Sequence, residues 1–278
     1  MPKAKKLRRK QLNNVVVVSD LHCGCGMGLI HRDGVKLDAG GHYKPSRLQL
    51  QVFDWWEEFW GEWIPKVTHG EPYAVVVNGD SIEGVHHKAT TPISANLEDQ
   101  ARVVFRILEP ITELCEGRFF MVRGTPAHVG PDAYDEEKVA RHLRAKQNTD
   151  GQYARFDLWL RVGGEKGGLV HFNHHIGTTA SSHHETSAIN AELGMAFCEA
   201  GRWRDEPPDI VVRSHRHRCA EVRLPSRNGY AVSFVTAAWQ LKTPFLYKVA
   251  GGRMTLPQIG GSLIRMGDEE LHTRHWVQ

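Results

Sequence analysis

Two runs of apolar residues that end abruptly in polar residues mark the first third of the chain. Four consecutive valines at 15–18 predict a buried strand over residues 13–19. The run Tyr73–Asn78 predicts a second strand of the same kind. An aspartate follows each run within two residues, Asp20 after the first and Asp80 after the second. The pattern therefore predicts strands that carry a carboxylate into the loop behind them.

Three stretches have apolar residues at helical spacing. The first begins at Ser46, which forms a capping-box pattern with Gln49, and extends to about Ile64. Tryptophans on its apolar face are predicted to belong to the core. A third strand, residues 118–123, separates the other two helices. The later helix, residues 133–146, has Asp132 as its predicted N-cap, and the earlier one places apolar residues at Val103, Val104, Ile107, Leu108, Ile111 and Leu114.

The second half of the chain is richer in strands. They are predicted at 155–162, 169–173, 210–213, 220–224 and 231–236. One helix, residues 182–200, interrupts them. Helices alternate with strands early and strands dominate later, which predicts an α/β sandwich whose sheets pack face to face with helices outside. We expect one domain, residues 13–278, behind a basic disordered tail, residues 1–12.

Charge and composition limit the classes of function. The chain of 278 residues has a formal net charge of +3, but six of its 35 Lys and Arg residues lie within the first ten positions. The remaining 29 are outnumbered by 32 acids, so the tail alone is basic, and a nucleic-acid role cannot rest on it. No apolar run is long enough to span a membrane or to form a signal peptide. Five cysteines, an odd number, favour reduced thiols, and we expect a cytoplasmic protein.

The histidines gather where the predicted strands end. Of 17 histidines, eleven lie at or just past such ends: His22, His86, His87, His128, His171, His174, His175, His183, His184, His215 and His217. Histidines and two aspartates together mark four strand ends, in the patterns Asp20-x-His22, Gly79-Asp80, His174-His175 and His215-x-His217. Mixed carboxylate and imidazole ligands suit Mn²⁺, Fe or Zn²⁺. A carboxylate shared by two metals is typical of a hydrolytic site.

In their order and spacing, these motifs resemble those of the calcineurin-like metallophosphoesterases, over roughly Val15 to Arg218. That family has Asp-x-His, Gly-Asp, Gly-Asn-His, a strand-end His and Gly-His-x-His. The segments Arg123–Thr125 and Ala238–Thr243 look similar to phage-encoded members. The resemblance implies a four-layer αββα sandwich with two central mixed sheets and one or two divalent metals, Mn²⁺ before Fe or Zn²⁺. It implies a first metal at Asp20, His22, Asp80 and His217 and a second at Asp80, His174 and His215.

The sequence departs from the family pattern at three points. Ser214 replaces the usual glycine before His215. His174 and His175 both fit the strand-end histidine, and His174 is preferred because it continues the alternation of Val170 and Phe172. His171 falls within the predicted strand and is a weaker choice.

The third motif differs most from the family. Gly124-Thr125-Pro126-Ala127-His128 stands where the family has Gly-Asn-His, so the asparagine that binds the second metal is missing. Pro126 stiffens the turn and could aim His128 at the metals. We expect His128 to be catalytic, as a proton donor or a phosphate contact. Its alternatives are a ligand of the second metal and a surface histidine.

Other residues of reactive type are given smaller roles. Cys23 and Cys25 flank the first motif but are not expected to be ligands. His86 and His87 follow Asp80 closely, and the sequence leaves open whether they face substrate or solvent. His183-His184-Glu185 lacks the second histidine of a zinc-protease motif. Neither a Walker phosphate loop nor a Gly-x-Ser-x-Gly elbow occurs.

By resemblance, the activity is hydrolysis of a phosphoester by a metal-activated hydroxide. We expect a phosphodiesterase or nuclease whose substrate is a phosphoester in DNA, RNA or nucleotides. The alternatives are a phosphomonoesterase acting on nucleotides or proteins, and a metal-binding module that has lost catalysis. The sequence leaves the oligomeric state open.

Overall fold

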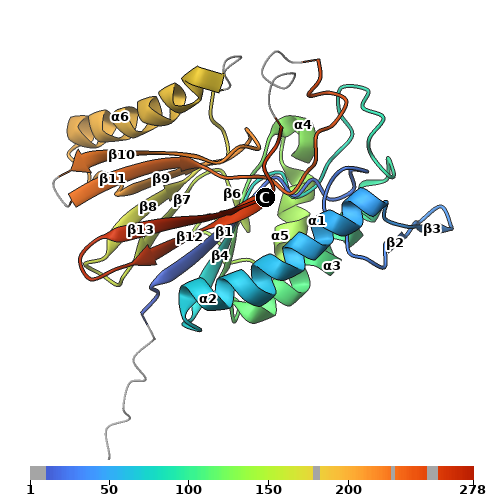
Figure 1. Ribbon diagram of the computed structural model, residues 1–278, viewed down its shortest axis with the longest axis horizontal. Coiled ribbons are helices and arrows are strands. Elements are labelled where there is room, and N and C mark those ends of the chain that lie inside the picture. The colour runs from blue at the N-terminus through green and yellow to red at the C-terminus, as the bar shows by residue number, and fades with distance from the viewer. Residues whose placement is uncertain (1–10, 178–181, 227–228, 249–255) are drawn as a thin grey trace, which may run out of the picture.

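Two mixed β-sheets packed face to face form the centre of the protein, and helices cover both outer faces (Figure 1). The computed structural model describes residues 11–177, 182–226, 229–248 and 256–278. Ten of the twelve residues of the predicted tail therefore lie outside the described residues. Helices α1, α2, α3 and α5 lie against the first sheet, and α6 lies against the second (Figure 1). This arrangement confirms the predicted four-layer αββα sandwich.

The first sheet has six strands in the order β13-β12-β1-β4-β5-β6. Pairs from β1 to β6 are parallel, whereas β12 runs antiparallel to both β1 and β13. The bounds are β1 Asn14–Val18, β4 Tyr73–Asn78, β5 Phe119–Val122, β6 Ala154–Arg155, β12 Gly260–Met266 and β13 Leu271–Val277. The hairpin of β12 and β13 was not predicted from the sequence. It supplies the second neighbour of β1, which would otherwise be an edge strand.

The second sheet has five strands in the order β10-β11-β9-β8-β7. Its central strand β9 is parallel to β8 and β11, and the outer pairs are antiparallel. The bounds are β7 Leu158–Val162, β8 Gly168–Phe172, β9 Ile210–Arg213, β10 Ala220–Ser226 and β11 Gly229–Val235. The strand predicted over 155–162 is therefore wrong at its start, because Ala154–Arg155 joins the first sheet and Leu158 begins the second.

The helices agree with the sequence in position more than in their ends. Their bounds are α1 Arg47–Glu58, α2 Ile64–Thr68, α3 Leu97–Leu114, α4 Pro126–Val129, α5 Tyr134–His142 and α6 Glu185–Trp203, with a 3₁₀ turn at Ser182–His184 and a short hairpin of β2 Val35–Lys36 and β3 His42–Tyr43. The Ser46 capping box is present. The predicted cap of α5 is wrong, since Ala133, at φ 51°, caps it. No helix among the described residues is long and apolar enough to cross a membrane.

The first predicted helix contains a π-helical turn, Phe59–Trp63, and continues past its predicted end at Ile64 as α2. Pro65 has no N–H to donate, and Ile64 donates its own N–H to Phe59 O, five residues back. The wider turn lets α1 and α2 form one continuous cover for the sheet. Its tryptophans lie in the core as predicted, with Trp56 and Trp60 only 4% and 6% exposed.

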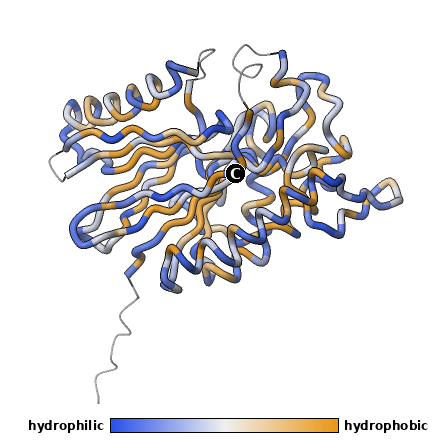
Figure 2. Tube along the Cα trace, viewed as in Figure 1, coloured by the Kyte–Doolittle hydropathy of each residue, from blue (hydrophilic) through white to orange (hydrophobic). Residues whose placement is uncertain are grey.

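The four valines of β1 divide between two cores. Val16 and Val18 pack with the helices that cover the first sheet, and Val15 and Val17 pack between the two sheets. Successive side chains of a strand point to opposite faces, so a strand that is buried on both faces must be apolar throughout. Figure 2 shows this as hydrophobic colouring along the central strands. Burial on this scale, about 1.5–3 kcal/mol for each valine, fixes where the strand ends and its polar residues begin.

An ion pair joins the two sheets at their edges, and it predicts how stability responds to pH. His275 of β13 lies 3.0 Å, Nε2 to Oε2, from Glu221 of β10. Burial opposes the charged form of His275, but contacts with Cys219 and Glu221 outweigh burial and raise its pKa to about 9. A histidine with a raised pKa stabilises the fold fully below its ordinary value of 6.5, and this contribution is lost as pH rises through about 9.

We therefore compare wild type and His275→Gln after treatment with a chelator, which removes any bound metal. Between about pH 6 and about pH 10, the free energy of unfolding of wild type should fall by about 2 kcal/mol more than that of His275→Gln. Urea unfolding at both pH values measures the difference. Equal losses in the two proteins would contradict the role of His275.

Candidate metal centre

The loops behind β1, β4, β8 and β9 meet at one edge of the sandwich. Asp20 N donates to Gly79 O at 3.0 Å, which joins the first two loops. Ser214 N donates to His174 O at 2.9 Å, which joins the other two. Asn78 Nδ2 donates to Ser214 Oγ at 2.7 Å and connects the two sheets. Because the carboxyl ends of these strands share one edge, polar residues far apart in sequence converge there.

Most of the predicted metal ligands occupy the left-handed backbone region. The φ values are 51° for Asp20, 43° for His22, 51° for Asp80, 72° for His215 and 56° for His217. For residues other than glycine this region costs roughly 1–2 kcal/mol each. Strain of this kind concentrates at functional sites, where surrounding structure holds it in place. Here it turns each side chain back from its strand end toward the shared edge.

Asp20, His22 and His217 form the first group of converging donors. His22 Nε2 and His217 Nε2 lie 3.1 Å apart, and Asp20 Oδ1 lies 3.2 Å from His217 Nε2. Asp20 Oδ1 is buried, and no hydrogen bond reaches it from the described residues. Buried polar atoms of this kind need a partner, and a divalent cation among three such donors provides one. The residues present therefore fit a metal.

Asp80, His174 and His215 form the second group. His174 Nε2 lies 3.0 Å from Asp80 Oδ2, and its Nδ1 donates to Asn78 O at 2.7 Å. That hydrogen bond leaves Nε2 of the neutral ring as the free ligand atom. His174 is fully buried, whereas His175 is exposed. The structure thus brings His174, the histidine preferred from the strand pattern, into the group.

The ionisable groups of the centre shift one another's pKa. Burial opposes protonation of His174, but the Asp80 and Asp20 carboxylates outweigh burial and raise its pKa to about 10. Burial likewise favours the neutral form of Asp80, but His174 holds the pKa of that carboxyl well below its usual range. Burial and the neighbouring His174 lower the pKa of His215 to about 4. A divalent cation would take over the role that the protonated His174 plays between the two carboxylates.

Glu83 is a buried carboxylate beside the donor groups that the sequence reasoning missed. Its Oε2 lies 3.0 Å from His22 Nδ1 and accepts from Gln240 Nε2 at 3.1 Å. Burial would raise the pKa of Glu83, but hydrogen bonds from His22 and His86 hold it below its usual range. A carboxylate on the far nitrogen of a metal-binding histidine fixes the tautomer and the ring. The requirement for such a partner was the available signal, since no local motif marks Glu83.

The structure places His128 beside the first group rather than on the surface. Its Nδ1 donates to Glu83 O at 2.6 Å, and its ring centroid lies 4.5 Å from that of His22. It also lies close enough to His22 and Asp80, and to Glu83 and His86, to share a metal with either pair. Burial and the neighbouring His22 lower the pKa of His128 to about 4. The imidazole is therefore neutral at pH 7, and because Nδ1 carries the proton, Nε2 is a hydrogen-bond acceptor.

The two cysteines next to the first motif lie outside the donor groups. Cys23 and Cys25 are 0% and 1% exposed, and burial raises the pKa of both thiols. A thiol must lose its proton to bind a metal, so both are poor ligands. All five cysteines are free.

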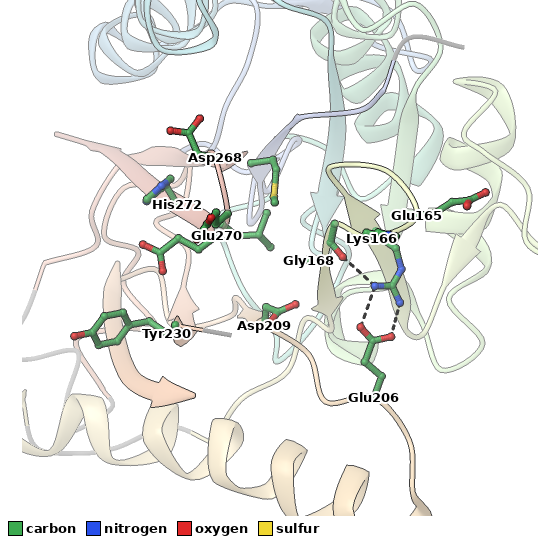
Figure 3. Close-up of a pocket in the computed structure, with 15 residues that line it drawn as sticks. Glu165, Lys166, Gly168, Glu206, Asp209, Tyr230, Asp268, Glu270 and His272 are labelled. Atoms are coloured by element: carbon green, nitrogen blue, oxygen red, sulfur yellow. Dashed lines mark hydrogen bonds and ion pairs between the residues drawn. The ribbon is translucent and has the colours of Figure 1, made fainter. Parts of the chain in front are cut away.

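A separate cavity of about 1060 Å³ opens at the opposite end of the second sheet. Figure 3 shows its wall with Glu206 labelled. The Arg161 guanidinium forms two hydrogen bonds with Glu206, at 2.9 and 2.5 Å. Further acidic side chains line it: Glu165, Asp209, Asp268, Glu269 and Glu270. Gly168 begins β8 and Asp209 precedes β9, so the cavity lies at the amino ends of the strands whose carboxyl ends carry the metal ligands. It is therefore distinct from the metal centre.

Comparisons with known proteins give distant similarities only. No family model matches the sequence, and no curated protein matches it. A predicted phosphoesterase from Streptococcus pneumoniae TIGR4 is 11% identical, over 96% of this chain and 98% of that chain, with a TM-score of 0.36. Vps29 from Entamoeba histolytica, in a single-mutant form, is 11% identical over 95% of this chain and 99% of that chain, with a TM-score of 0.36.

Proposed function

We propose that this chain is a metal-dependent phosphoester hydrolase of the calcineurin-like kind. The observation that carries the proposal is the pair of adjacent donor groups, one around Asp20 and one around Asp80. The two groups touch, since His174 Nε2 lies 3.0 Å from Asp80 Oδ2 and 3.9 Å from Asp20 Oδ1. Two neighbouring sites that combine carboxylate and imidazole suit a hydrolytic pair of metals. The motif order in the sequence supports the same proposal.

We propose Mn²⁺ as the resident metal, with Fe or Zn²⁺ as alternatives, because the donors are nitrogen and oxygen without thiolate. Asp20, His22 and His217 would hold one metal, and Asp80, His174 and His215 the other. When bound, the metals would supply Lewis acidity, which lowers the pKa of water from about 15.7 to about 7 and offsets phosphoryl charge. Glu83 would keep the His22 ring oriented toward its metal.

His128 would act on the leaving group. Its Nδ1–H is held by Glu83 O, so Nε2 is the ring nitrogen left free to exchange a proton. In the metal-free chain its pKa is about 4, because burial and His22 disfavour its charged form. Negative charge on a bound phosphoester favours that charged form, so Nε2 would gain its proton as substrate binds. The proton would then be available to the departing oxygen.

For the substrate we propose a phosphodiester of nucleic acid or a nucleotide, in the cytoplasm. The segment after Trp239 supports a base-binding role, since Trp239 N donates to Asp20 O at 3.0 Å and anchors the start of the segment beside the centre. Phe245 is 45% exposed and stacks on His87, with ring centroids 5.6 Å apart. Lys242 Nζ lies 4.2 Å from the ring centroid of Tyr247. Aromatic faces beside a cation are the usual means of binding unpaired bases.

Metal-dependent turnover tests the proposal directly. Purified protein should contain Mn, Fe or Zn by elemental analysis, and chelation should abolish hydrolysis of a bis-aryl phosphodiester. Restoring Mn²⁺ should restore the rate. The diester should be cleaved with a higher kcat/KM than the matching aryl monoester.

The other outcomes correct the proposal in different ways. A preference for the monoester would make the protein a phosphomonoesterase. Full metal content without turnover of either ester would make it a metal-binding module. A folded sample that takes up no metal from a supplemented buffer would refute the metal centre itself.

A further inference from the structure

The Thr125 hydroxyl lies among the donors of the second group. Its Oγ1 is 3.0 Å from Asp80 Oδ2, 3.2 Å from His174 Nε2 and 3.1 Å from His215 Nδ1. A hydroxyl offers one proton and two acceptor lone pairs, so Oγ1 can hydrogen bond to all three atoms only while His174 Nε2 and His215 Nδ1 both carry a proton. A metal ligand must be an unprotonated nitrogen, so metal binding removes both N–H donors and leaves the lone pairs of Oγ1 free at this position.

The distances match those between ligands of one metal. Neighbouring ligand atoms lie about 3.0 Å apart around an octahedral ion with bonds of about 2.1 Å, and about 3.3 Å apart around a tetrahedral ion with the same bonds. Thr125 Oγ1 keeps 3.0–3.2 Å from Asp80, His174 and His215, and the Asp80 and His174 donor atoms lie 3.0 Å apart. Oγ1 thus occupies the position of a fourth ligand atom beside the three converging donors of Asp80, His174 and His215.

The backbone holds the hydroxyl in this place. Thr125 has φ −68° and ψ 131°, the extended conformation that the following Pro126 favours. Its N–H donates to Asp80 Oδ1 at 2.6 Å, and Gly124 N donates to Glu136 Oε2 at 2.6 Å. A Cβ on Gly124 would lie 2.1 Å from Asp80 Oδ1, so only glycine allows this approach. The loop is therefore preorganised to present one oxygen, as a ligand position requires.

We propose that the Thr125 hydroxyl oxygen is the fourth protein ligand of the second metal, completing Asp80, His174 and His215. This inference rests on the proposed function, since it assumes that the centre holds metal. A neutral hydroxyl donates more weakly than a carboxylate or an imidazole. The second site is accordingly the weaker one, and the protein holds one metal when metal is scarce and two when it is abundant.

A competing arrangement predicts the opposite sign. If the hydroxyl only fills the space of the metal and hydrogen bonds to the bare donors, binding must displace it. Removing the hydroxyl would then strengthen the second site, because nothing would be displaced. The direction in which the affinity of the second site changes therefore shows whether the hydroxyl is a ligand or only occupies the place of the metal.

Titration of chelated protein with Mn²⁺ by calorimetry is the first test, on wild type, Thr125→Val and Thr125→Ser. Valine keeps the shape and removes the oxygen, and serine keeps the oxygen. We expect Thr125→Val to weaken the second equivalent by about 10–100-fold and to leave the first within about twofold. Thr125→Ser should stay within a few-fold of wild type at both sites. A second equivalent that is unchanged or tighter in Thr125→Val would overturn the proposal.

A second variant, read out by absorption spectroscopy, tests the ligand position even if Thr125→Val does not fold. In Thr125→Cys loaded with Co²⁺, a sulfur ligand would give a thiolate-to-cobalt charge-transfer absorption that wild type lacks. The five native cysteines are outside the donor groups, so wild type is the baseline. Absence of this absorption at two bound equivalents would refute the ligand position. Failure of wild type to bind any metal would instead refute the proposed function.

Discussion

Replacing Asp80 by asparagine should release metal and lower turnover by roughly 10²–10⁴-fold, because loss of one partner from a buried charged group costs about 3–5 kcal/mol. Asp80 is 1% exposed and accepts from the Thr125 N–H at 2.6 Å. It also lies near enough to share a metal with His22 on one side and His174 on the other. Asparagine tolerates positive φ, so the φ of 51° at this position can persist and the change tests charge alone.

Metal content by elemental analysis and kcat/KM on the aryl diester measure the effect of Asp80→Asn. Asp157→Asn is the matched control, since Asp157 pairs with His171 away from the centre. Cys23→Ser and Cys25→Ser should also retain metal and rate. Full metal content in Asp80→Asn, with loss in either cysteine variant, would show that the ligands are assigned to the wrong residues.

The second large effect is expected at His128. His128→Ala should keep its full metal content and lose roughly 10²–10⁴-fold in rate, the usual contribution of a positioned general acid. The loss should shrink for an ester whose leaving group departs without a proton. Comparing esters with good and poor aryl leaving groups measures this dependence, and it isolates proton donation from a general disturbance of the site.

His142→Ala provides the control for His128→Ala, because His142 pairs with Glu109 at the surface. Loss of one metal equivalent in His128→Ala would make His128 a ligand, alongside Glu83 and His86 or alongside His22 and Asp80. Wild-type kinetics on every ester would leave His128 without a part in the reaction.

The sequence predicted those strands best that are buried on both faces. The bounds of β4 and β9 were predicted residue for residue, because an apolar run followed by a polar turn leaves little freedom. The hairpin of β12 and β13 escaped prediction for a physical reason. Gly261 has low strand propensity, but a Cβ there would lie 2.6 Å from the Phe59 ring, so packing against a distant helix selects glycine. Such a constraint is invisible in the local pattern.

The site was predicted to the extent that its residues lie at strand ends. Asp20, Asp80 and His217 could be found because each follows an apolar strand, and the structure brings them to one edge. Glu83 and Glu136 could not, since their parts depend on contacts made through the fold. Glu136 is fully buried, and burial and nearby Asp80 raise its pKa to about 7. From the sequence, Thr125 could be recognised only as a departure from the family's asparagine, because its position among three donors depends on contacts made through the fold.

The place of β12 has a consequence for how the chain is made. Val17 of β1 pairs with Ser262 of β12, about 245 residues later in the sequence. At roughly 5–20 residues per second, a ribosome needs about 12–50 s to pass from one to the other. During that time β1, an apolar strand, has one edge without a partner, which is the condition that invites aggregation. Nascent chains should therefore depend on chaperones until β12 emerges, and loss of β12 and β13 should impair solubility more than loss of any surface loop.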